Sequence, residues 1–164
     1  MANPNVPQGL IPHGRIYRAR TYVAGGTVYP GDAVKLDNAG KVVAAAAGAA
    51  QVLGAALTYA TTGLDVSVAD DPDQEFRIKS DDATEPAAQT ALNLNYNIVA
   101  TTGSTGYKCS RQSLDGSSGV SDSNMPLKLL ALDVRPGNVY GAYADCIVII
   151  NNHPLKGGTG TLGV

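Results

Sequence analysis

The sequence predicts an all-β protein, and three observations lead to this prediction. Nineteen glycines and nine prolines punctuate the 164 residues, which favours short elements joined by many turns. Several short segments alternate apolar with polar side chains, the pattern of a half-buried strand. Near the end of the chain, two apolar runs flank Arg135-Pro136-Gly137-Asn138, a sequence that reverses the backbone, so a closing pair of strands is expected.

Residues 1–14 are predicted to form an extended arm. Several prolines and glycines in this segment break any regular element. Val6, Leu10 and Ile11 are apolar, although a terminus that meets only solvent has little need of apolar side chains. These three residues are therefore candidate contacts, either with the chain's own domain or with a neighbouring subunit. The alternative is a frayed terminus.

A single β domain is expected over residues 15–153. Its first strands are predicted at 15–23, 28–36, 41–44 and 51–57. Asp37-Asn38-Ala39-Gly40 has the composition of a tight hairpin turn, and Gly54 suggests a bulge or a close approach of another backbone. For the alanine-rich segment 44–50 we expect a strand end and a loop rather than a short helix, because Gly48 interrupts it.

Two cleanly alternating segments, 64–68 and 75–79, lie on either side of the turn Asp70-Asp71-Pro72-Asp73. They are predicted to pair as a hairpin. The side chains expected to point inward are Leu64, Val66, Val68, Phe76 and Ile78.

The second half of the domain is less regular. Residues 85–92 are expected to form one short helix with Pro86 in its first turn, and 92–99 to form a strand. Residues 101–124 are polar and weakly patterned, which is typical of a long loop that is mobile or functional. The chain ends in a glycine-rich tail, 154–164, whose Leu155 and Leu162 are further candidate contacts.

Composition limits the kinds of partner. Only 16% of the residues are charged and the net charge is -2, so no basic surface for nucleic acid is expected. No segment is apolar for long enough to span a membrane, and the first residues lack the basic and apolar regions of a secretory signal.

The sequence contains no recognisable catalytic or metal-binding motif. His13 and His153 stand far apart in the sequence, and the acidic group 70–75 lacks the ligand order of a calcium loop, so a turn is the preferred interpretation there. We therefore expect no catalytic residues, no cofactor and no metal, and predict that the protein is not an enzyme. Cys146 is expected to be a small buried apolar residue, while Cys109 is a candidate reactive thiol. A disulfide between the two cysteines is the remaining alternative.

Three stretches, taken in order, resemble the capsid cement (head decoration) proteins of tailed bacteriophages. The first joins Tyr29-Pro-Gly-Asp-Ala-Val-Lys-Leu to the hairpin turn and to Val52-Leu-Gly-Ala-Ala56. The second is Asp70-Asp-Pro-Asp-Gln-Glu-Phe-Arg-Ile-Lys79. The third combines Leu127-Lys-Leu-Leu-Ala-Leu, the turn 135–138 and Ile149-Ile-Asn-Asn-His153. Together they cover most of residues 28–153, and leave the arm and the tail outside the match.

The resemblance implies a small β-barrel or β-tulip-like domain and a structural role in the virion. Such a protein, made in the host cytoplasm, would sit on the outside of the head and bridge subunits of the major capsid protein against the pressure of packaged DNA. It would also self-associate, with a trimer favoured.

Two other functions remain as alternatives. One is a carbohydrate-binding β module of a phage tail or surface that stacks sugars on Tyr140 and Tyr143. The other is a hydrolase whose carboxylates no motif reveals.

Overall fold

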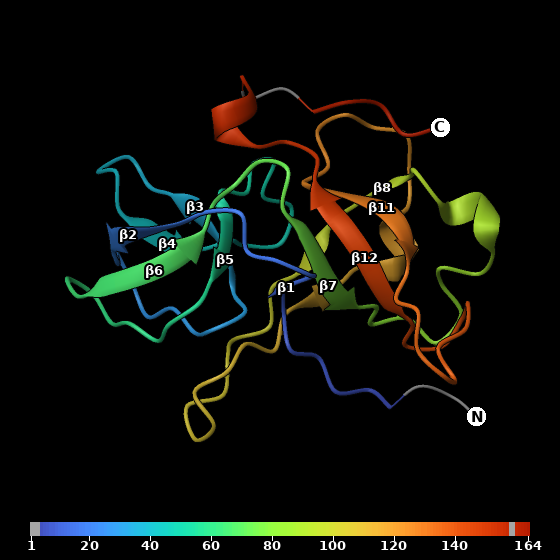
Figure 1. The fold of residues 1–164 in the computed structure, drawn as a ribbon, viewed down its shortest axis with the longest axis horizontal. Helices are drawn as coiled ribbons and strands as arrows, with labels where there is room; N and C mark the ends of the chain where they lie inside the picture. The colour runs from blue at the N-terminus through green and yellow to red at the C-terminus, as the bar shows by residue number, and fades with distance from the viewer. Residues whose placement is uncertain (1–3, 158–159) are drawn as a thin grey trace.

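The computed structural model describes residues 4–157 and 160–164, and the all-β prediction is confirmed (Figure 1). The strands are β1 (Ile11–Pro12), β2 (Ala19–Val23), β3 (Ala33–Leu36), β4 (Val42–Ala44), β5 (Gly54–Ala56), β6 (Asp65–Ala69), β7 (Glu75–Lys79), β8 (Asn95–Tyr96), β9 (Ile98–Val99), β10 (Ser113–Leu114), β11 (Leu127–Leu132) and β12 (Asp145–Ile150). Three short 3-10 helices accompany them: η1 (Gln89–Ala91), η2 (Gly116–Ser118) and η3 (Pro154–Lys156). Residues 1–3 of the predicted arm and 158–159 of the predicted tail lie outside the described residues.

The strands form two five-stranded antiparallel sheets and one strand pair. The first sheet has the order β1-β7-β12-β11-β8, the second β2-β6-β5-β3-β4, and β9 pairs with β10. In Figure 1 the second sheet lies at the left and the first at the right. The chain begins in the first sheet with β1, builds the whole second sheet, and returns to the first at β7.

The sheets do not close into a barrel in the part of the chain that is described. The second sheet curls until Ala24, just after β2, bridges Val42 in β4. This contact is a single bridge because bends at Gly25 and Gly26 then take the chain away from β4. The barrel expected from the resemblance is therefore replaced by a curled, open sheet beside a second open sheet.

The protein has two hydrophobic cores. One fills the space between the sheets and includes Leu10, Phe76, Leu127, Leu129 and Val148, all of them completely buried. The other lies inside the curl of the second sheet and is made of smaller side chains. Its members are Ala24, Val28, Val34, Val42, Leu53, Ala56, Ala60, Val66 and Val68.

The predicted hairpin of β6 and β7 is wrong, although both strands exist. β6 pairs with β2 and β5, whereas β7 pairs with β1 and β12. The turn between them carries the chain from one sheet to the other because Asp70 is tied to β2. Its buried carboxylate accepts hydrogen bonds from Arg18 Nε at 2.9 Å and Tyr22 OH at 2.6 Å. Leu64 was expected to point inward, but it precedes β6 in a turn and is exposed.

Two other predicted features are confirmed. β3 and β4 pair across the Asp37–Gly40 turn, with Lys35 opposite Val43. Gly54 lies so close to the neighbouring strand that a Cβ there would collide with the carbonyl oxygen of Ala69.

The closing pair of strands also forms, with a correction. β11 and β12 pair antiparallel from Leu127 opposite Ile150, with a register shift between Leu129 and Ala131. The second strand begins only at Asp145, so the apolar start of the predicted strand at Val139 belongs to the connecting loop.

The segments between residues 85 and 124 differ most from expectation. The predicted helix at 85–92 shrinks to η1, and the predicted strand at 92–99 divides into β8 and β9, which belong to different sheets. The polar segment 101–124 protrudes only over its first part, where Ser104 bridges Cys109 (Figure 1, lower left). Its middle part, residues 112–116, packs inside, because Gln112 accepts a hydrogen bond from the Ala33 N–H at 2.7 Å and donates to the Ala45 carbonyl, whereas most of 117–124 is exposed again.

Candidate interaction surface

The N-terminal arm is fixed to its own domain at residues 9–13. Gly9 N–H donates to the Gln112 carbonyl at 3.0 Å, and Leu10 N–H donates to the Gly31 carbonyl at 2.7 Å. Gly9 and Gly31 both have positive φ and touch so closely that a side chain on either would collide with backbone. Ile11 then pairs with Arg77 of β7. Because Leu10 is completely buried in the core, it is an anchor within the chain rather than a contact for a partner.

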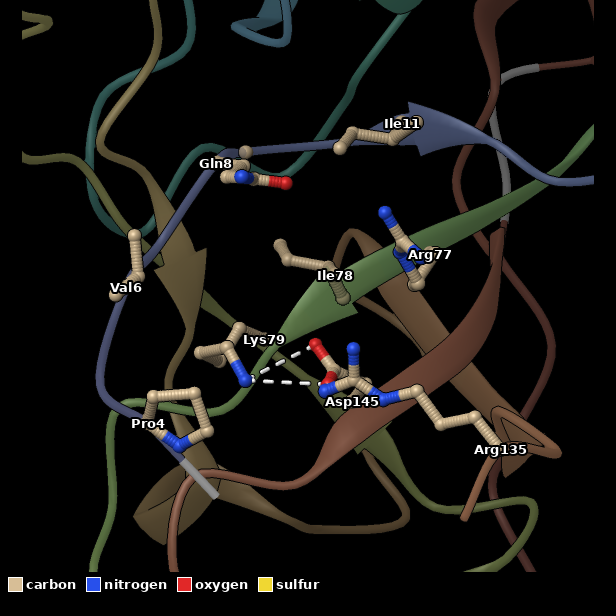
Figure 2. Close-up of a pocket in the computed structure, with 10 residues that line it drawn as sticks. Pro4, Val6, Gln8, Ile11, Arg77, Ile78, Lys79, Arg135 and Asp145 are labelled. Carbon is tan, nitrogen blue, oxygen red and sulfur yellow. Dashed lines mark hydrogen bonds and ion pairs between the residues drawn. The ribbon is translucent and has the colours of Figure 1, made fainter. Parts of the chain in front are cut away.

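The first part of the arm forms one wall of a cavity of about 130 Å³ (Figure 2). Val6 remains 56% exposed and lines this cavity together with Ile11, Pro4 and Gln8. The candidate contact Val6 therefore lies beside a hollow in the surface, three residues before the anchored Gly9, and Ile11 is half-buried.

The opposite wall of the cavity is charged and comes from β7, β12 and the loop before β12. Lys79 Nζ lies 3.1 Å from each oxygen of the Asp145 carboxylate and also donates to the Tyr143 carbonyl. Arg135 forms a second ion pair with Asp145. Burial lowers the pKa of Lys79, and the nearby Arg135 lowers it further. Both members of the Lys79–Asp145 pair are buried, so their charges are poorly screened by water.

Asn138 positions the loop that carries Arg135. Its amide nitrogen donates to the carbonyls of Asp133 and Asp145 at 2.8 Å, and Asp145 N–H donates back to its side-chain oxygen at 2.9 Å. The turn 135–138 singled out by the sequence therefore does more than reverse the chain. It closes the loop onto the first residue of β12.

The C-terminal tail also lies on its own domain. Thr161 N–H donates to Asn151 Oδ1 at 3.0 Å, while Asn95 Nδ2 donates to the Thr161 carbonyl at 2.8 Å. The candidate contacts Leu155 and Leu162 are 49% and 67% exposed, so both point apolar surface outward from a tethered backbone. The structure thus separates the sequence-predicted contacts into a buried anchor, Leu10, a half-buried strand residue, Ile11, and three exposed positions on the two terminal segments.

His153 holds the start of the tail and makes it sensitive to acid. The ring is completely buried, and its Nδ1 accepts the Leu155 N–H at 3.0 Å. Burial lowers the pKa of His153 below its usual 6.5. The neutral ring is therefore favoured in the folded state. Its contribution to the free energy of unfolding is fully present above pH 6.5, the ordinary pKa, and is lost as the pH falls through the lower pKa of the folded state.

We expect the free energy of unfolding to decline in this acid range, and expect a smaller decline in His153→Asn. An asparagine can still accept the Leu155 N–H but cannot be protonated there. Denaturant titrations at several pH values compare the two proteins. Parallel pH profiles would contradict this role of His153.

The other residues considered from the sequence are tyrosines and cysteines. Tyr140 and Tyr143 are half-buried, whereas Tyr107, in the protruding loop, is 89% exposed. Cys109 and Cys146 are both free, so the disulfide alternative is wrong, and burial raises the pKa of Cys146 to about 12.

The buried carboxylates each have their own partners. Asp32 accepts the Tyr29 N–H at 2.9 Å, Asp70 is held by Arg18 and Tyr22, and Asp145 is held by Lys79. Within residues 4–157 and 160–164, no group of three or more His, Cys, Asp or Glu side chains could hold a metal ion.

The charged wall of the cavity was missed by sequence reasoning. Arg77 and Lys79 alternate with buried Phe76 and Ile78, so the pattern placed them on the outer face of a strand. Only the pairing of β7 with β12 brings Lys79 opposite Asp145, and no local signal in the sequence gives that register.

Two comparisons with known proteins find no relative of this chain. The chain matches no protein-family model, and a search of curated proteins finds no match to its sequence. None of the described helices has the length and hydrophobicity needed to cross a bilayer.

Proposed function

We propose that this chain is a structural protein of a tailed-bacteriophage virion, which binds the outside of the head and bridges neighbouring subunits of the major capsid protein. The proposal rests on the three stretches that resemble capsid cement proteins. It is supported by a body of antiparallel sheets whose two terminal segments carry apolar side chains outward. Such a protein would strengthen the head against internal pressure. Its self-association, with a trimer favoured, stays a prediction.

The structural observation that supports this function is the geometry of the arm. The arm is anchored from Gly9 onward, so Val6, three residues earlier, has a smaller range of positions than in a free terminus, and binding a neighbour there would cost less ordering entropy. On a capsid the same weak contact is repeated by many identical copies, which converts modest affinity into lasting attachment.

A substitution at Val6 tests this proposal more sharply than removal of the arm. Deleting residues 1–14 would also remove Leu10 from the core and β1 from the first sheet. Val6→Glu changes an exposed side chain, and we expect it to weaken binding to empty expanded heads of the encoding phage by about tenfold or more, since a carboxylate would be desolvated in the contact. Co-sedimentation with the heads measures the effect.

Val23→Glu is the matched control. Val23 is a half-exposed valine on β2, in the other sheet, and its substitution is expected to leave binding unchanged. Equal binding of Val6→Glu and the unmodified protein would show that the arm takes no part in the contact. If the unmodified protein failed to bind heads at all, the proposed function itself would fall.

A further inference from the structure

The cavity beside the arm contains more positive than negative charge. Arg77, Lys79 and Arg135 line it, and they share only two carboxylates, those of Asp145 and Asp133. Glu75 lies two residues before Arg77, on the same face of β7, but it does not line the cavity. Asp145 already serves two of the cations, so one positive charge in this group has no full counter-charge among the described residues.

The two arginines have capacity left for a further acceptor. Arg77 Nη1 lies 3.6 Å from Asp133 Oδ2, which is longer than a good hydrogen bond. A guanidinium has five N–H donors, and the side chains of Arg77 and Arg135 remain about one-third exposed. In Figure 2 both arginines and Lys79 lie around one hollow, with the amide of Gln8 on the arm side.

The size of the cavity limits what it can hold. Its volume of about 130 Å³ leaves room for one side-chain-sized anion. The arm residues Val6 and Ile11 add an apolar wall, which suits the methylene groups of such a side chain.

We propose that this cavity binds a single carboxylate of a partner protein, held between Arg77 and Arg135 with its hydrocarbon stem against the arm. The inference rests on the proposed function in one respect, because it assigns the acidic side chain to a capsid subunit. Planar guanidinium groups bind carboxylates through paired, charge-assisted hydrogen bonds, and these are the donors that the cavity leaves available.

The test uses the isolated full chain, so its outcome does not depend on capsid binding. Acetate at pH 7 is the probe, added at constant ionic strength against chloride and followed by two-dimensional amide NMR. We expect saturable shifts at Val6, Arg77 and Lys79 with a millimolar dissociation constant. Arg77→Gln should weaken acetate binding by about tenfold or more, whereas Arg111→Gln, at an exposed arginine that does not line the cavity, should not change it.

Three outcomes would overturn the inference. The first is the absence of saturation by acetate. The second is equal binding by Arg77→Gln and the unmodified chain, with a preserved amide spectrum showing that the variant is folded. The third is saturation by inorganic phosphate but not by acetate, which would assign the cavity to phosphate. Should acetate bind as expected while the chain fails to bind heads, the carboxylate site would stand and the capsid assignment would be wrong.

Discussion

Replacing Leu10 with alanine is expected to lower the free energy of unfolding by about 2–5 kcal/mol. Leu10 is completely buried among Phe76, Ile78 and Leu114 in the core between the sheets. Its loss would leave a cavity and would weaken the attachment of β1, because the flanking residues dock on either side of it. Denaturant unfolding measures the change.

Val6→Ala is the matched control for Leu10→Ala, since it shortens another apolar arm side chain that is largely in solvent. Its effect on unfolding is expected to lie within about 0.5 kcal/mol. If Leu10→Ala were equally mild, the arm would not be anchored through the core, and proteolysis of its first residues would be as fast in the unmodified protein as in the variant.

Replacing Asp145 with asparagine is expected to cost about 3–5 kcal/mol, because it leaves the buried ammonium of Lys79 without its counter-charge. Removing both charges together, in Lys79→Met with Asp145→Leu, should recover much of that loss, since the buried ammonium is gone and only the more exposed Arg135 still lacks its carboxylate. Asp133→Asn is the comparison for a more exposed pair, that with Arg77, and should cost less than about 1 kcal/mol.

Unfolding free energies of the unmodified protein and the three variants measure these differences. The asparagine variant should also gain stability as the pH rises toward the ordinary lysine pKa of 10.5, because deprotonation removes the unpaired charge. A loss below about 1 kcal/mol in Asp145→Asn would show that Lys79 finds enough water or other partners to remain charged without Asp145.

The sequence predicted which segments are strands better than it predicted which strands meet. Alternation places Val66, Val68, Phe76 and Ile78 inside, and all four are buried. A short turn between two such segments normally gives a hairpin, yet here it joins two sheets. The reason is Asp70, whose carboxylate binds Arg18 and Tyr22 across the second sheet, a contact between distant parts of the chain that no local pattern contains.

The candidate contacts could likewise be predicted only in part. The apolar residues of the arm and tail could be found from composition, but their individual roles could not. Leu10 and Val6 look equivalent in the sequence, and only the carbonyl of Gly31 and the neighbouring core decide that one is buried and the other exposed. Polar Gln112 was assigned to a loop, because its burial depends on bonds to distant residues: it accepts the Ala33 N–H and donates to the Ala45 carbonyl at the second sheet.

The position of β1 has a consequence for the order in which this chain can fold. The arm is synthesised before its partners: Gly31 follows soon after it, but β7 and the carbonyl of Gln112 are made much later. The entire second sheet is synthesised before β7, and Leu10 stays in water during that time. Closing so long a loop costs entropy before any contact between its ends forms. Docking of the arm is therefore a late event, and it joins residues 11–12 to a sheet that is otherwise built from residues 75–150.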